Sequence, residues 1–79
     1  MSDATDRGVE LMEFVAKSLV SAPDRVTVEV ADDGSTLELN TDDDDRGRVI
    51  GRQGRVAKAM RALLGKTPGC SALRLDIVD

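Results

Sequence analysis

The chain of 79 residues is long enough for one small domain, and its 33% charged and 41% hydrophobic residues are typical of a folded, water-soluble protein. It has no histidine and one cysteine, Cys70, which excludes a zinc finger, an intrachain disulfide and histidine-dependent catalysis. No apolar run approaches the roughly 20 residues that cross a bilayer, and a free thiol fits a reducing compartment. We therefore expect no membrane insertion and a cytoplasmic location.

The first regular segment has apolar residues at helical spacing. They recur three or four positions apart, at Val9, Met12, Ala16 and Leu19. This periodicity predicts an amphipathic helix from about Asp6 to Val20, and Pro23 ends it.

Two strands follow, joined by a tight turn. Residues 25–30 alternate polar residues with valines, and residues 35–40 place Leu37 and Leu39 on one face. This alternation predicts half-buried strands, and Asp32-Asp33-Gly34 between them is a hairpin-turn signal. We therefore expect a β-hairpin.

Four consecutive aspartates, Asp42 to Asp45, come next. They predict a solvated loop in which Asp45 is the N-cap of the following helix. A cation site is the alternative, but consecutive aspartates lack the spaced pattern of a calcium-binding loop. We favour the loop.

The last part of the chain predicts two helices and a strand. A short helix precedes Gly51, a longer one runs from Gly54 to Leu64 with Gly65 as its C-terminal cap, and residues 71–78 alternate as a strand. The order α-β-β-α-α-β predicts an α+β fold: a two-layer sandwich with a three-stranded sheet and three helices.

Charge is distributed unevenly along the chain. The formal net charge is −4, but residues 1–45 carry thirteen acidic and three basic side chains, whereas residues 46–66 carry seven basic side chains and no acid. Such asymmetry favours a polyanion-binding face. The alternative is a solvated, arginine-rich helix face without a ligand.

The segment Gly51-Arg52-Gln53-Gly54 is a G-x-x-G turn between the two helices. Two glycines permit a sharp turn and leave no Cβ to hinder an approaching phosphate. The following helix points its free N–H groups at the turn, and Arg52 and Arg55 add positive charge. The pattern predicts contact with a sugar–phosphate backbone rather than with base edges. A purely structural helix-turn-helix is the alternative.

Residues 47–55, G-R-V-I-G-R-Q-G-R, resemble the V-I-G-x-x-G signature of KH domains. The order of elements is similar to that of the type II, prokaryotic form, and the length resembles the KhpA family of small bacterial single-KH RNA-binding proteins. The resemblance covers roughly residues 8–78. We accordingly predict one KH domain over residues 8–79 after a disordered N-terminus at residues 1–7.

The resemblance implies that the turn clamps the backbone of about four nucleotides of single-stranded RNA. The RNA-binding residues that it implies are Arg48, Val49, Ile50, Gly51, Arg52, Gln53, Gly54, Arg55 and Lys58. The bases would lie on an apolar floor formed by Val49, Ile50 and Val56. The motif contacts backbone, so it does not distinguish RNA from single-stranded DNA.

The resemblance also implies partners and a cellular role. The implied assembly is a homodimer, a heteromer with a KhpB-type KH protein (also called Jag or EloR), or both. The implied role is that of an RNA chaperone or post-transcriptional regulator linked to cell growth and division. The residues themselves predict no enzyme, no cofactor and no metal, because the chain has no histidine and no paired catalytic carboxylates.

A second function class stays open. The acidic surface favours a KH-shaped protein-interaction or dimerisation module with little RNA binding of its own. The helix over residues 54–64 also carries a wide apolar arc, which is either a well-buried face or, around Leu63, a self-association surface. Because Phe14 is the only aromatic residue, little base stacking is available, and we expect modest affinity and little sequence specificity.

Overall fold

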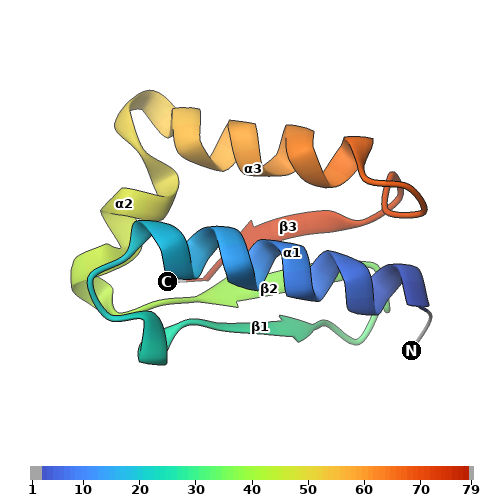
Figure 1. Ribbon diagram of the computed structural model, residues 1–79, viewed down its shortest axis with the longest axis horizontal. Helices are drawn as coiled ribbons and strands as arrows, with labels where there is room; N and C mark the ends of the chain where they lie inside the picture. Colours follow the sequence, from blue (N-terminus) through green and yellow to red (C-terminus); the bar gives the residue numbers. More distant parts are fainter. Residues whose placement is uncertain (1–2, 79) are drawn as a thin grey trace.

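The computed structural model describes residues 3–78 and has the predicted order of elements (Figure 1). The helices are α1 (Asp3–Leu19), α2 (Arg46–Ile50) and α3 (Arg55–Lys66), and the strands are β1 (Thr27–Val30), β2 (Thr36–Asn40) and β3 (Arg74–Ile77). Single 3₁₀ turns at Pro23–Arg25, Asp43–Asp45 and Arg52–Gly54 connect them. This confirms the predicted α-β-β-α-α-β order of an α+β fold.

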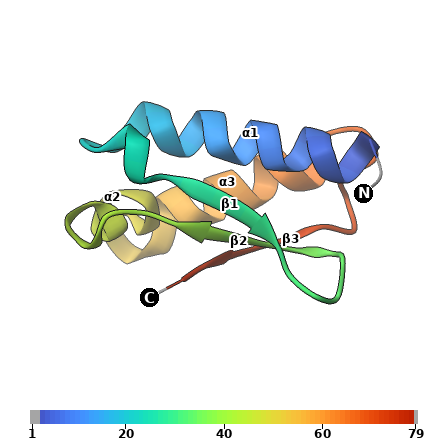
Figure 2. The ribbon, with the colours of Figure 1, turned by 90° about the horizontal axis from the view of Figure 1, so that it is seen from below.

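The three strands form one mixed sheet in the order β1-β2-β3. β1 and β2 are antiparallel, as the hairpin requires, and β3 lies parallel to β2 at the opposite edge. Helices α1 and α3 pack on one face of this sheet, so the domain has two layers (Figure 2). The parallel connection from β2 to β3 passes through α2, the G-x-x-G turn and α3.

The core lies between these layers. Its buried members come from all three helices, from β2 and β3, and from the segments that precede β1 and β3: Met12, Ala16, Val26, Leu37, Leu39, Val49, Met60, Leu64, Cys70 and Leu75. Burial of a large side chain of this kind contributes about 1.5–3 kcal/mol before the entropy cost of folding. Leu19, which the helical periodicity assigns to the apolar stripe, is instead 40% exposed near the end of α1.

The N-terminus differs from the prediction. Residues 3–7, predicted as disordered, form the first turns of α1, whereas residues 1, 2 and 79 lie outside the described part of the chain. Two contacts hold these turns on the loop before β3: the Arg7 guanidinium donates to the carbonyl of Pro68 (2.6 Å), and the Cys70 thiol donates to that of Ala4 (3.2 Å). Sixty-one and sixty-six residues separate the partners, so local sequence does not reveal them.

The end of α3 also differs from the prediction. Gly65 is not the cap, because the helix continues through it to Lys66. Thr67 ends the helix: its N–H donates to Leu64 O (3.2 Å), and its hydroxyl donates to Leu63 O (2.8 Å). Thr67 is extended, with φ −78° and ψ 129°, because the next residue, Pro68, disfavours helical backbone at the position before it.

The other face of the sheet is open and acidic. The register places Glu29 opposite Glu38, and Glu38 opposite Asp76, so three carboxylates form one row across all three strands. Residues directly opposite share a face of the sheet, and like charges in such positions repel. The polyanion-binding face predicted from the sequence therefore cannot be this one.

Candidate nucleic-acid interface

The G-x-x-G turn has a backbone that only its own residue types accommodate easily. Gly51 ends α2 with φ 77° and ψ 171°, and Gly54 precedes α3 with φ 73° and ψ 16°. A Cβ at Gly51 would stand 2.8 Å from the backbone nitrogen of Val56, so no larger residue fits. A Cβ at Gly54 would meet open space, so glycine is favoured there because of the left-handed backbone conformation rather than for lack of room.

Gln53 is the one non-glycine residue with positive φ (57°) among the described residues. Its side-chain oxygen accepts a hydrogen bond from Arg55 (3.1 Å), across the start of α3. The backbone N–H groups of Arg52 and Gln53 have no acceptor among the described residues and lie directly before the N-terminus of a twelve-residue helix. Such a set of N–H groups, with the positive end of the helix dipole, attracts anions.

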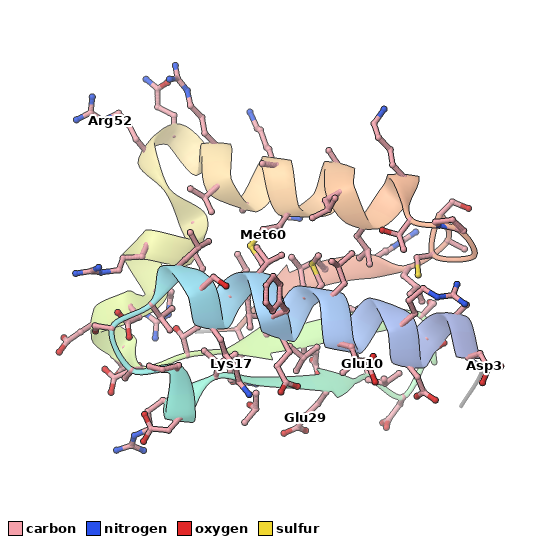
Figure 3. The ribbon with its side chains drawn as sticks, in the orientation of Figure 1. Asp3, Glu10, Lys17, Glu29, Arg52 and Met60 are labelled. Carbon is pink, nitrogen blue, oxygen red and sulfur yellow. The ribbon has the colours of Figure 1, made fainter. Side chains whose placement is uncertain are left out.

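The turn's side chains stand clear of the body of the protein. Arg52, Gln53 and Arg55 are exposed, and Arg52 projects outward from the turn at the end of the molecule (Figure 3). Lys58 is exposed one turn further along α3. None of the ion pairs between described side chains involves Arg52 or Lys58, so the full charge of both is available to a polyanion.

The basic residues before the turn are partly neutralised. Arg46 forms an ion pair with Asp43 at 2.8 Å, and the Nε of Arg48 lies 3.6 Å from Asp45 Oδ1. Both pairs use the acidic run that directly precedes α2. Arg48 nevertheless remains 62% exposed, so a phosphate can still reach its guanidinium.

The predicted apolar floor needs a correction. Val49 has no exposed surface and belongs to the core, so its side chain cannot contact a ligand in this conformation. An apolar residue on α2 must enter the core to hold so short a helix in place, and Val49 does this. Ile50 is 37% exposed and Val56 is half-buried, so these two can still contribute to the floor.

A cavity between α3 and β3 provides an apolar surface that the sequence analysis did not identify. It has a volume of about 330 Å³ and is lined by Arg61, Leu64, Leu73, Arg74 and Leu75. The Nε of Arg61 donates to the backbone carbonyl of Leu75 (3.1 Å), which ties α3 to the free edge of the sheet. Arg61 lies within the basic stretch, but only the fold brings it beside Arg74.

Asp45 occupies the predicted N-cap position of α2, but its side chain is hydrogen-bonded elsewhere. Its side chain makes no capping bond to α2, and the cap of the preceding 3₁₀ turn is Asp42, which accepts from the N–H of Asp44 (3.0 Å). The Asp45 carboxylate, only 1% exposed, accepts instead from Ser21 N (3.0 Å), Ser21 Oγ (2.8 Å) and Ala22 N (3.0 Å). The backbone hydrogen bond from Ser21 is the largest cause that lowers the pKa of Asp45, against the opposing effect of burial.

Other site types find no support in the described part of the chain. Within residues 3–78, no three potential metal-ligating side chains gather into a group that could hold an ion. No helix there combines the length and the apolar character needed to cross a membrane.

A G-x-x-G turn between two helices, set in the order α-β-β-α-α-β over a three-stranded sheet, defines a KH domain of type II. Residues 9–67 match the family described as "KhpA/KhpB, KH domain". The chain therefore belongs to the KhpA/KhpB family of KH-domain proteins. Because this family is non-enzymatic, the prediction that the chain is not an enzyme is confirmed.

Several curated proteins are similar to the chain over most of its length. The "RNA-binding protein KhpA" of Halalkalibacterium halodurans is 47% identical, with 87% of this chain and 96% of that protein covered. The proteins of the same name from Borreliella burgdorferi and Mycobacterium leprae are 41% and 40% identical. These two matches cover 90% of this chain and, respectively, 92% and 90% of those proteins. No solved structure is significantly similar to the chain.

Proposed function

We propose that this protein binds single-stranded RNA by holding the sugar–phosphate backbone at the turn Gly51–Gly54. The observation that carries the proposal is the turn itself, with two N–H groups free of acceptors, Arg52 projecting outward and the start of α3 directly behind. A phosphate placed there gains hydrogen bonds, the helix dipole and a cation together. The relatives named as RNA-binding proteins agree with this function.

In this proposal the bases extend from the turn along α3 toward the cavity between α3 and β3. Its leucines offer apolar surface to the base faces, and the guanidinium planes of Arg61 and Arg74 can stack on bases. Phe14 is 71% exposed on α1, outside the residues that line this cavity, so no aromatic ring contributes to stacking there. We therefore expect modest affinity, little sequence preference and binding of single-stranded DNA as well.

Self-association is the second part of the proposal. Leu63 is 45% exposed on α3, although its neighbour Leu64 is buried in the core. An exposed leucine within the basic stretch suits contact with a second KH domain, either another copy or a KhpB-type protein. Paired domains would bind one RNA with higher avidity and would suit an RNA chaperone or a post-transcriptional regulator of growth and division.

The competing function is a protein-interaction module that does not use RNA. It is favoured by the acidic run before α2 and by the carboxylate row on the open sheet face. The two functions predict opposite results for variants of the turn. A module without RNA binding keeps its activity when Arg52 and Gln53 are replaced, whereas an RNA clamp loses it.

The test is fluorescence anisotropy with short labelled single-stranded RNAs at two salt concentrations. The variants are Arg52→Asp, Arg52→Asp/Gln53→Asp and the control Arg25→Asp, which changes charge as much as Arg52→Asp but lies in the 3₁₀ turn after α1. Circular dichroism first establishes that each is folded. We expect salt-sensitive binding by the parent and the control, and at least tenfold weaker binding by the double variant. Equal losses in control and turn variants would mean that net charge alone, rather than a clamp, holds RNA.

A separate measurement addresses self-association. Leu63→Glu is compared with the parent by light scattering, with Ala62→Glu, also exposed on α3, as the matched control. We expect only Leu63→Glu to lower the molar mass. A monomeric parent protein would contradict the homodimer and leave the heteromer.

A further inference from the structure

The contact between Asp45 and the loop after α1 is unusual for a carboxylate in an acidic run. Asp42, Asp43 and Asp44 are at least partly open to solvent, whereas Asp45 is buried and accepts three hydrogen bonds of 2.8–3.0 Å from Ser21 and Ala22. These partners are 24 and 23 residues away along the chain. Asp45 therefore joins the end of α1 to the residue at which α2 begins.

α2 depends on such an anchor. It has only five residues, too few for its own hydrogen bonds to stabilise it in water. Val49 holds its C-terminal part in the core, and Asp45 holds its start. The N–H of Gly51 donates to Gly47 O (2.8 Å), so the G-x-x-G turn is bonded directly to this short helix. A displacement of the Asp45 backbone would consequently move Gly51 as well, because only the short helix α2 lies between them.

We propose that Asp45 is a positioning residue for the RNA clamp, acting through α2 on the geometry of Gly51–Gly54. This inference rests on the proposed function. For a variant that neutralises Asp45, it predicts a change in RNA affinity opposite in sign to the change expected from charge alone. Neutralising a carboxylate beside a polyanion site, and freeing Arg48 from its contact with that carboxylate, should strengthen RNA binding if charge alone matters. If Asp45 positions the clamp, the same change weakens binding, because the turn loses its geometry.

The matched pair of variants is Asp45→Asn and Asp44→Asn. Both remove one negative charge from adjacent positions of the acidic run, but Asp44 is exposed, and the hydrogen bonds from Ser21 and Ala22 go to Asp45 instead. In Asp45→Asn, one carboxylate oxygen becomes an NH₂ donor that faces the N–H and hydroxyl donors of Ser21 and Ala22. We expect Asp45→Asn to bind labelled RNA about tenfold more weakly, and Asp44→Asn to bind as the parent or up to about twofold more tightly.

A milder variant keeps the test decisive if Asp45→Asn folds poorly. Ser21→Ala removes only the hydroxyl bond and leaves the two backbone bonds to Asp45 in place. It should weaken RNA binding about two- to threefold without changing any charge. Tighter binding by Asp45→Asn, or unchanged binding by both Asp45→Asn and Ser21→Ala, would overturn the proposal.

Amide hydrogen exchange provides a second test of the proposal, which does not require RNA. In folded Asp45→Asn, we expect amides at Gly51–Arg55 to exchange at least about tenfold faster, with the amides of Leu37 and Leu39 in the central strand unchanged. Uniformly faster exchange would mean a merely structural role and would overturn the proposal. If the parent protein fails to bind RNA but the local effect at the turn is present, the proposed function fails while the anchoring role of Asp45 stands.

Discussion

Two glycine-containing turns of this domain differ in whether a side chain accepts hydrogen bonds from the nearby backbone N–H groups. In the hairpin turn between β1 and β2, Gly34 has φ 75°, and Asp33 accepts from Ser35 N (2.9 Å), Thr36 N (2.9 Å) and Thr36 Oγ1 (2.7 Å). The Asp33 side chain thus accepts from the backbone N–H groups that follow this turn. In the turn Gly51–Gly54 the glycines have similar φ values, but no side chain accepts from the backbone N–H groups that follow Gly51 or Gly54.

The comparison shows that positive-φ glycines alone do not indicate a binding site. In the hairpin turn an aspartate side chain accepts from the N–H groups two and three residues further on, whereas the arginine and glutamine of the G-x-x-G turn accept from no backbone N–H group. A turn that leaves its donors free is stable only where solvent or a ligand satisfies them. Four predictions test this difference, from the largest expected effect to the smallest.

Gly51→Ala should be the most damaging substitution in either turn. Its Cβ would stand 2.8 Å from the backbone nitrogen of Val56, and φ 77° is unfavourable for alanine. We expect a loss of about 2–4 kcal/mol in the free energy of unfolding, measured by urea denaturation. A loss equal to that of Gly34→Ala, which meets nothing within 4 Å, would contradict the close approach to Val56.

Gly54→Ala and Gly34→Ala form a matched pair. Both residues have positive φ, 73° and 75°, and a Cβ at either meets open space. Each should lower the free energy of unfolding by about 1 kcal/mol, the cost of left-handed backbone. Only Gly54→Ala should also weaken RNA binding in the anisotropy assay. If both variants bind RNA equally well, the approach of a phosphate to Gly54 is not part of the clamp.

Acid should destabilise the hairpin turn through Asp33. Hydrogen bonds lower its pKa from 3.8, that from the N–H of Ser35 most, so its stabilising effect is present above about pH 3.8 and is lost as the pH falls through the lower folded value. The pKa of Asp45 is also lowered, so the stability that its carboxylate contributes is likewise lost as the pH falls. Urea midpoints of the parent and of Asp33→Asn should therefore converge as the pH falls below 3.8. A difference that is independent of pH would contradict the role of the charged carboxylate.

Glu38→Gln should have the smallest effect, and a stabilising one. Glu38 stands between Glu29 and Asp76 on the open sheet face, where like charges repel. Its neutralisation should raise the free energy of unfolding by about 0.2–1 kcal/mol at low salt and by less at high salt. RNA affinity should stay within about twofold, because the row lies outside both turns. A marked gain in affinity would mean that general charge, rather than the clamp, controls binding.

Local patterns predicted most of the secondary structure and the location of the candidate site. Alternating valines and leucines indicated the strands, apolar spacing indicated the helices, and the G-x-x-G segment indicated the turn, because each signal depends on residues only a few positions apart. The start of α1 was predicted wrongly because distant contacts decide it: residues 3–7 are helical, and Pro68 and Cys70 form hydrogen bonds with them. The end of α3 was predicted wrongly for a local reason, because Pro68 rather than Gly65 determines where the helix stops.

The sequence by itself determined the fold class, the family signature and the basic stretch that contains the turn. Only the tertiary structure decided that Val49 is core rather than binding surface and that Arg61 and Arg74 share one cavity. It also decided that Asp45 bonds to Ser21 rather than capping α2. The physical reason is the same in each case. Periodicity reports which face of its own helix or strand a residue occupies, whereas burial, pairing and hydrogen bonding depend on which distant element covers that face.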